Sequence, residues 1–219
     1  MFRNLVILGC LIATSVAAEP VIKKGAAGWK AWDLKAAPDE GWKGIEFDDA
    51  AWKEATTPLG YGKEPVTTTL SFGGDGEKKH PTAYLRKAFE VKEKAAGYVI
   101  KVRLDDGAIL SLNGKEIQRL YVAPDVKPGE YSKLALGPGV LELESTLILE
   151  AEHVKVGKNI LAIALFQAGP KSSDLYLNLE LKPVDAEGLE ALKKEAAERK
   201  QKRDEAEKKE AEQKKSPVV

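Results

Sequence analysis

The sequence predicts an all-β domain followed by a charged α-helix, and two stretches carry most of this prediction. Val102 to Arg119 alternates apolar side chains between two faces, as strands do, and contains Asp106-Gly107 and Asn113-Gly114. Because both dipeptides adopt positive φ at low cost, each is expected to close a hairpin, giving a three-stranded meander. Residues 186–215 consist mainly of Ala, Glu, Lys and Arg, which are strong helix formers.

Length and charge limit the classes of function. The 219 residues suffice for one globular domain with a substantial core and additional segments. The formal net charge is zero, so no broad field attracts the chain to nucleic acid or to an anionic membrane. Neither is expected as a partner.

The first 18 residues are typical of a secretory signal peptide, with Arg3, a short apolar run and a small-residue cleavage site at Val16-Ala17-Ala18. The apolar run is too short for a membrane span. The mature protein is therefore expected to be exported, to the periplasm or beyond the cell. A lipoprotein anchored through Cys10 is the less favoured alternative, because few apolar residues precede that cysteine. Cys10 is the only cysteine, so a mature chain cleaved after Ala18 would have no disulfide.

Four tryptophans follow a short opening segment, residues 19–28. Aromatic side chains bring large areas into a core, which is the favoured interpretation of each tryptophan. Tryptophan also stacks on sugar rings, and this second interpretation is kept open for Trp29 and Trp42, which follow glycines. Trp52 is expected to point inward.

The remaining segments are expected in the following order. Residues 56–81 are rich in Gly and Thr without periodicity, which favours a functional or mobile loop. Alternating or continuous apolar patterns predict further strands. The expected strands are 84–91, 98–104, 140–156, 159–167 and 175–181. The second is expected to pair with the first or to lie near it, the third to be broken near Glu144, and the fourth to be covered on both faces. A long connection is expected over 121–138, because it holds three prolines and two glycines.

Several motifs together resemble one known family. A strand ending in D-D-G precedes L-N-G-K-E-I at residues 112–117, and an opening F-D-D-x-x-W at 47–52 is followed by P-L-G-Y-G at 58–62. G-K-N-I-L-A at 157–162 and S-S-D at 172–174 come near the end. The chain is thus similar, over about residues 25–182, to the galactose-binding-domain-like jelly rolls of carbohydrate-binding modules, glycoside hydrolases and many secreted bacterial proteins. The resemblance implies a jelly-roll β-sandwich over residues 19–183, with 184–219 as a helical tail.

The tail offers little apolar surface. Five Glu–Lys or Glu–Arg pairs stand four residues apart with the acid first, which stabilises an isolated helix. Only Leu189 and Leu192 could pack against another element, so a solvated helix is expected rather than a coiled coil. Docking of a protein partner through this tail is an open alternative.

Catalysis is not expected. A mature chain without Cys10 has no thiol nucleophile, the two histidines are His80 in a loop and His153 in an expected strand, and no G-x-S-x-G or H-E-x-x-H motif occurs. Asp48-Asp49 and Asp105-Asp106 are better explained as turn residues than as paired glycosidase carboxylates.

A ligand site is expected in loops at one end of the sandwich, as the resemblance implies. The candidates are aromatic side chains and polar groups able to pair with hydroxyls. They are Trp29, Trp42, Tyr61, Asp105, Asp106, Asn113, Arg119 and Gln167. Some relatives have His-Gln where this chain has Phe166-Gln167, which removes one polar group.

The resemblance also implies that a structural calcium ion is sometimes bound at one end of the sandwich. The carboxylates available for it are Asp48, Asp49, Asp105, Asp106 and Asp174. Their spacing specifies no metal site, and no other cofactor is expected.

The sequence therefore predicts an exported, non-catalytic module that binds carbohydrate or another extracellular or envelope ligand. One alternative is a structural or protein-interaction module of a cell-envelope assembly, without a small ligand. A second is an accessory domain related to a glycoside hydrolase.

Overall fold

The computed structural model describes residues 18–134 and 144–215. The expected signal peptide, except its last residue, and Cys10 lie outside the described residues, as does the first part of the expected 140–156 strands. Helix α1 (Ala186–Lys215) is strongly polar, and among the described residues no helix has the apolar length that a bilayer requires.

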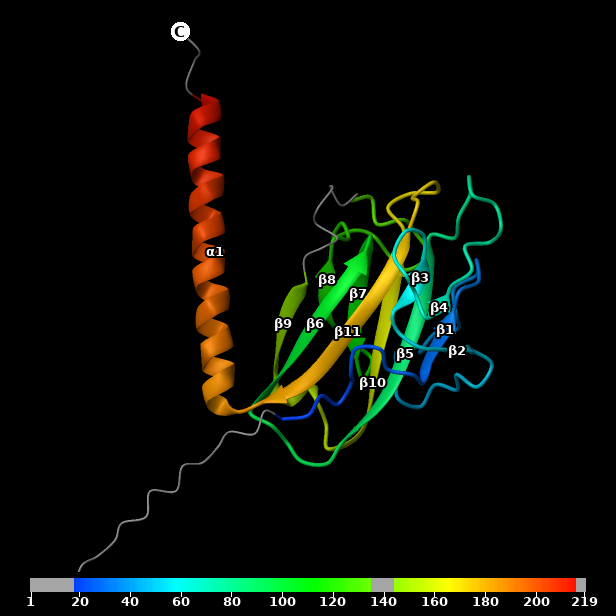
Figure 1. Ribbon diagram of the computed structural model, residues 1–219, viewed down its shortest axis with the longest axis horizontal. Helices are drawn as coiled ribbons and strands as arrows, with labels where there is room; N and C mark the ends of the chain where they lie inside the picture. Colours follow the sequence, from blue (N-terminus) through cyan, green and yellow to red (C-terminus); the bar gives the residue numbers. More distant parts are fainter. Residues whose placement is uncertain (1–17, 135–143, 216–219) are drawn as a thin grey trace, which may run out of the picture.

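Two β-sheets form the body of the molecule (Figure 1). One sheet has six strands in the order β2-β1-β5-β10-β7-β8, and the other has five in the order β4-β3-β11-β6-β9. The strands are β1 (Trp29–Trp32), β2 (Lys53–Ala55), β3 (Leu59–Tyr61), β4 (Thr68–Thr69), β5 (Thr82–Val91), β6 (Gly97–Asp105), β7 (Gly107–Leu112), β8 (Lys115–Leu120), β9 (Ser145–Glu150), β10 (Gly157–Phe166) and β11 (Leu175–Val184). A short 3₁₀ helix, η1 (Ala151–His153), follows β9 in place of a continued strand. The expected all-β sandwich with a helical tail is confirmed.

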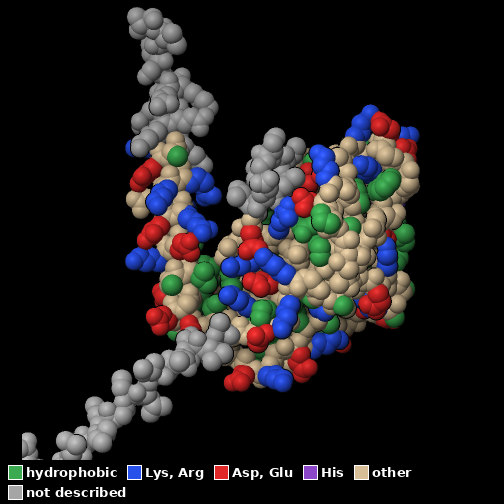
Figure 2. Space-filling model, viewed as in Figure 1, with side chains coloured by type: hydrophobic (Ala, Val, Ile, Leu, Met, Phe, Trp, Pro, Cys, Tyr) green, Lys and Arg blue, Asp and Glu red, His purple; other side chains and the backbone are tan. Residues whose placement is uncertain are grey.

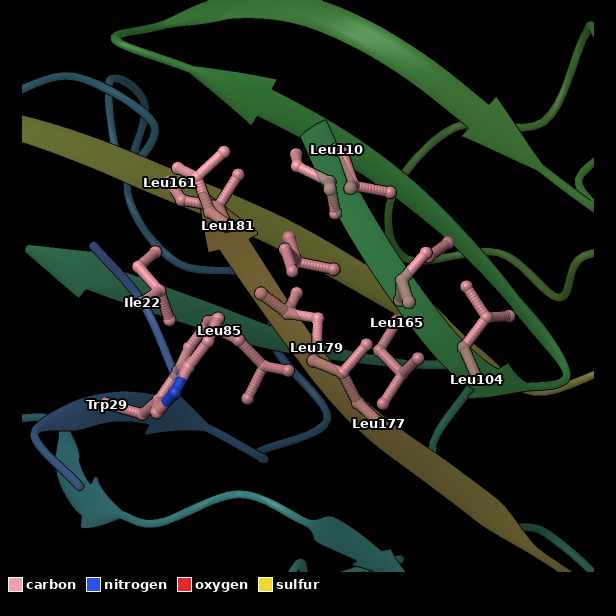
Figure 3. Packing of buried hydrophobic residues seen from close by; sticks show 14 of the residues in the cluster. Ile22, Trp29, Leu85, Leu104, Leu110, Leu161, Leu165, Leu177, Leu179 and Leu181 are labelled. Carbon is pink, nitrogen blue, oxygen red and sulfur yellow. The ribbon is translucent and has the colours of Figure 1, made fainter. Parts of the chain in front are cut away.

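The main core lies between the two sheets. Leu175, Leu177, Leu179 and Leu181 alternate along β11 and are all buried, as the sequence pattern predicts. Figure 3 shows Leu177 and Leu179 packed close to Leu165 of β10. Each fully buried leucine contributes about 1.5–3 kcal/mol through the area removed from water.

The expected three-stranded meander is wrong in its first turn. β6 pairs with β11 and β9 in one sheet, whereas β7 pairs with β10 and β8 in the other. Asp106 therefore sits at a corner where the chain crosses between sheets, and its N–H donates to the carbonyl of Phe166 at 3.2 Å. The second turn is a hairpin as predicted, with positive φ at Asn113 (53°) and Gly114 (90°). β5 and β6 do not pair either, because β5 belongs to the six-stranded sheet and β6 to the five-stranded sheet.

A second apolar layer covers the outer face of the six-stranded sheet. Trp42 and Trp52 stack with their ring centroids 6.2 Å apart, and Trp42 meets Tyr84 of β5 edge-to-face at 5.2 Å. Asp48 accepts a hydrogen bond from the backbone N–H of Ala50 at 2.9 Å, which is the turn role expected for this carboxylate. The segment carrying Trp42 is thus folded back onto the sheet.

The long helix touches the sandwich mainly at its beginning. Leu189 is buried and packs on Gly97, where a Cβ atom would lie 2.9 Å from a Leu189 methyl carbon. Lys193 forms an ion pair with Glu150 of β9 at 3.0 Å. Beyond these contacts α1 runs beside the sandwich (Figure 1), and its side chains from Lys194 to Ala206 are exposed. The expected pair Glu195–Arg199 is present at 2.7 Å.

Removing residues 185–219 from the mature protein is expected to abolish most of the helical far-UV circular dichroism signal. The sandwich should still unfold cooperatively, because Leu189 is the helix residue buried against it, and one leucine contributes only about 1.5–3 kcal/mol. Urea unfolding and circular dichroism of both forms measure this. A helical signal that survives the truncation would contradict the assignment of α1.

Candidate functional site

Four of the expected ligand residues meet at the end of the sandwich that lies opposite the start of α1 (Figure 1). Tyr61 ends β3, Asp105 ends β6, Asp106 forms the corner, and Gln167 directly follows β10. β11 lies between β3 and β6 and pairs Leu175 with Tyr61 and its neighbour Tyr176 with Asp105. We call Tyr61, Asp105, Asp106 and Gln167 the end cluster.

The end cluster is buried and largely hydrogen-bonded. The side-chain amide of Gln167 donates to the hydroxyl of Tyr61. Asp106 Oδ2 accepts from the backbone N–H of Ala168 at 2.6 Å and from the hydroxyl of Ser172 at 2.8 Å. The other amide atom, Gln167 Oε1, is buried without a hydrogen-bond partner among the described residues.

Burial controls the protonation of two groups in the cluster. It raises the pKa of Asp105 to about 8, and the adjacent negative charge of Asp106 adds to this effect. Asp105 is only 5% exposed, and the raised pKa favours the neutral form of its carboxyl group. Burial likewise raises the pKa of Tyr61, which stays neutral and able to donate a hydrogen bond.

An aromatic pair and a lysine lie over the cluster. The rings of Tyr61 and Phe72 meet edge-to-face with centroids 5.3 Å apart, and Phe72 is only partly buried. The ammonium group of Lys79 lies 5.5 Å from the Tyr61 ring and 5.6 Å from the Phe72 ring. It also donates to the carbonyl of Ser172. Lys79 therefore occupies a position in contact with both rings.

The two tryptophans that the sequence left open belong to apolar layers. Trp29 is completely buried in the core between the sheets, and Trp42 is 7% exposed in the outer layer. Their burial agrees with the favoured interpretation of both as core residues, and it disagrees with the alternative kept open, in which they stand in loops with rings accessible to a sugar. Neighbouring glycines did not indicate exposure, because Trp29 begins a strand and Trp42 folds back onto Tyr84.

The other two candidates have structural contacts away from the end cluster. Asn113 lies in the β7–β8 turn, donates to Asn159 Oδ1 at 2.9 Å and accepts from the N–H of Ile160 at 3.0 Å. Arg119 on β8 binds Glu116 at 2.7 Å and the carbonyl of Val126 at 2.8 Å. Neither residue is brought to the site.

The carboxylates considered for calcium divide between two places. Asp48 and Asp49 lie in the loop against β5, where Asp49 binds Arg86, whereas Asp174 is near enough for its charge to raise the pKa of Asp105. Within residues 18–134 and 144–215, no group of three or more Asp, Glu, His or Cys side chains is arranged to hold a metal.

Sequence reasoning missed Phe72, Lys79 and Ser172 as members of the site. Phe72 and Lys79 lie within the irregular segment 56–81, which the lack of periodicity marked as a functional loop. Short strands β3 and β4 inside that segment were also missed. Phe72, an aromatic residue next to Gly73 and Gly74, was the one available signal.

Comparisons with known proteins give no family for the chain. No family model matches, and no curated protein matches. Solved structures with a similar arrangement include a glycosyl hydrolase family 2 member from Bacteroides cellulosilyticus (TM-score 0.49, 15% identity, 75% of this chain and 21% of that chain). A β-glycosidase from Bacteroides vulgatus has TM-score 0.48 and 14% identity over 74% of this chain and 20% of that chain. A Bacteroides uniformis β-glucuronidase has TM-score 0.49 and 11% identity over 77% of this chain and 18% of that chain. The chain thus spans about a fifth of the length of these structures.

Proposed function

We propose that the chain is an exported, non-catalytic module that binds a neutral carbohydrate at the end cluster and its aromatic pair. The observation that carries this proposal is the unpartnered acceptor Gln167 Oε1 beside the hydroxyl of Tyr61. An unsatisfied buried acceptor costs about 1–3 kcal/mol, which a ligand hydroxyl would recover. Burial, the charge of Asp106 and a hydrogen bond to Asp106 all raise the pKa of Asp105, which lowers the negative charge of this corner and suits an uncharged ligand.

The aromatic pair supports a sugar in particular. Phe72, which is only partly buried, presents a ring on which the apolar face of a sugar can pack, and the buried ring of Tyr61 supports it edge-to-face. The ammonium group of Lys79 lies beside both rings. Because its side chain is long and flexible, it can swing away when a ligand takes its place, without rearrangement of the sheets.

The arrangement does not favour hydrolysis. A glycosidase requires two carboxyl groups on opposite sides of the scissile bond, about 5–10 Å apart. Asp105 and Asp106 are instead adjacent at one corner, and Asp106 is occupied by Ala168 and Ser172. We therefore assign both carboxyl groups to shaping the site.

Phe72→Ala is expected to weaken binding of a neutral oligosaccharide about tenfold, because about 1.4 kcal/mol of ring contact would be lost. Hits are first found by screening the mature protein, residues 19–219, on a glycan array, and affinities are then measured by isothermal titration calorimetry. Phe47→Ala is the matched control, since Phe47 is another partly buried phenylalanine but packs on Trp52 in the outer layer. It should not change the affinity.

Lys79→Ala tests the same site through an expected gain of affinity. It should strengthen binding, because the ligand would no longer displace the ammonium group from the two rings. Equal losses in the Phe72 and Phe47 variants, or no binding of any glycan by the folded protein, would contradict the proposal. The structural-module alternative would then be preferred.

A further inference from the structure

A groove of about 470 Å³ separates α1 from the outer face of the five-stranded sheet. Its closed end is fixed where Leu189 packs on Gly97 and Lys193 pairs with Glu150. From there α1 runs beside the sandwich, and Figure 2 shows Lys and Arg side chains along the side of the helix that faces the sheet. None of the residues that line this groove belongs to the end cluster.

The floor of the groove is aliphatic. Leu192 and Ala196 line it from α1, four residues apart and so on one face of the helix, and Ile148 lines it from β9. Thr146 of β9 and Lys101 of β6 are paired neighbours on the same sheet face and lie beside this floor. None of the described residues that line the groove is aromatic.

The walls of the groove are basic. Lys101, Arg199, Lys200 and Arg203 line it together with a single carboxylate, that of Glu195. Arg199 pairs with Glu195 at 2.7 Å and Lys200 with Asp204 at 2.6 Å, and these side chains are about half exposed or more. Exposed ion pairs are weak, so carboxylates of a partner can replace them at little cost.

We propose that this groove binds an acidic polypeptide segment of a partner protein, with an aliphatic side chain on the floor and carboxylates on the walls. Arg199 and Arg203 can form bidentate hydrogen bonds with carboxylates. Such bonds select the geometry of the partner's carboxylates as well as their charge. An anionic glycan fits less well, because the groove lacks an aromatic ring on which a sugar could stack. The partner is therefore a protein.

The probe is a fluorescein-labelled eight-residue peptide of alternating Glu and Leu, added to the full mature protein. Fluorescence anisotropy should show saturable binding at low salt, weaker at high salt because exposed charges are screened. A peptide with every Leu replaced by Ser should bind at least tenfold more weakly. Equal binding of both peptides would mean that charge alone acts and would overturn the proposal.

Variants locate the binding to the groove. The double variant Arg199→Glu, Arg203→Glu should weaken peptide binding at least tenfold. Lys194→Glu, Lys208→Glu makes the same change of charge at exposed helix positions that do not line the groove, and should alter the affinity less than twofold. Circular dichroism verifies that both variants keep the helix.

Equal losses of peptide affinity in the two double variants, or full competition by polygalacturonate, would overturn the proposal. Glycan binding at the end cluster should be unchanged in both, so this test and that of the proposed function fail separately.

Discussion

Arg86→Ala is expected to lower the free energy of unfolding by about 3–5 kcal/mol, the loss typical of a buried ion pair from which one partner is removed. Arg86 lies on β5 and is 1% exposed. Its Nε donates to Asp49 Oδ2 at 2.7 Å, and its two terminal nitrogens donate to the carbonyls of Trp42, Gly44 (2.9 Å) and Phe47 (3.3 Å). The substitution would leave a carboxylate and three carbonyl oxygens without this donor.

Urea unfolding of the mature protein measures this loss. Lys30→Ala is the matched control on the neighbouring strand β1, because Lys30 pairs with the exposed Glu54 and should contribute less than about 1 kcal/mol. Asp49→Asn should fall between the two, since the carbonyl acceptors keep their donor. A loss below about 1.5 kcal/mol in Arg86→Ala would show that the loop holds to the sheet through its aromatic residues alone.

The role of Arg86 illustrates what the sequence could not predict. Alternation along residues 84–91 correctly predicted a strand, yet it places a charged residue on the face that normally meets solvent. That face is covered here by the segment carrying Trp42 and Phe47, about forty residues earlier in the chain. Nothing local to either segment indicates this contact, because the acceptors of Arg86 are mainly backbone carbonyls.

The corner at Asp106 shows the same limit for topology. Asp-Gly is a strong hairpin signal, and the flanking strands were placed correctly to within about a residue. Which sheet each strand joins depends on its partners: β11 for the first and β10 for the second. Both partner strands begin after residue 156, far along the chain from this corner, so the local pattern is the same for a hairpin and for a crossing between sheets.

The sequence predicted the site residues that lie at the ends of strands and missed those that lie in loops. Asp105, Asp106 and Gln167 stand at or beside the ends of strands that the sequence pattern predicted, whereas Tyr61 was found through the P-L-G-Y-G motif and ends a strand that was missed. Phe72 and Lys79 reach the same place through an irregular loop whose path depends on its own hydrogen bonds, such as that from His80 N–H to the carbonyl of Phe72 at 3.0 Å. The order of the strands determines where the strand-end residues lie. No periodic sequence pattern indicates where the loop residues Phe72 and Lys79 lie.

Asp105→Asn is expected to remove a marked dependence of stability on pH. The carboxyl of Asp105 has a pKa of about 8 in the folded protein, against 3.8 in a model compound. Between these values the folded protein binds one more proton than the unfolded chain, so the free energy of unfolding falls as pH rises. The slope from this residue is at most about 1.4 kcal/mol per pH unit, and it vanishes below pH 4 and above pH 8 or so.

The variant isolates this effect because asparagine resembles the protonated acid in shape and carries no charge. Urea unfolding at pH 5 and pH 8 should show the wild-type protein losing several kcal/mol more than Asp105→Asn between these conditions. Asp48→Asn is the control, since that carboxylate is exposed and should leave the wild-type pH profile unchanged. Parallel profiles for wild type and Asp105→Asn would mean that Asp105 is ionised in the folded protein at pH 7. The end cluster would then hold two negative charges, and a neutral ligand would no longer be the one that suits it.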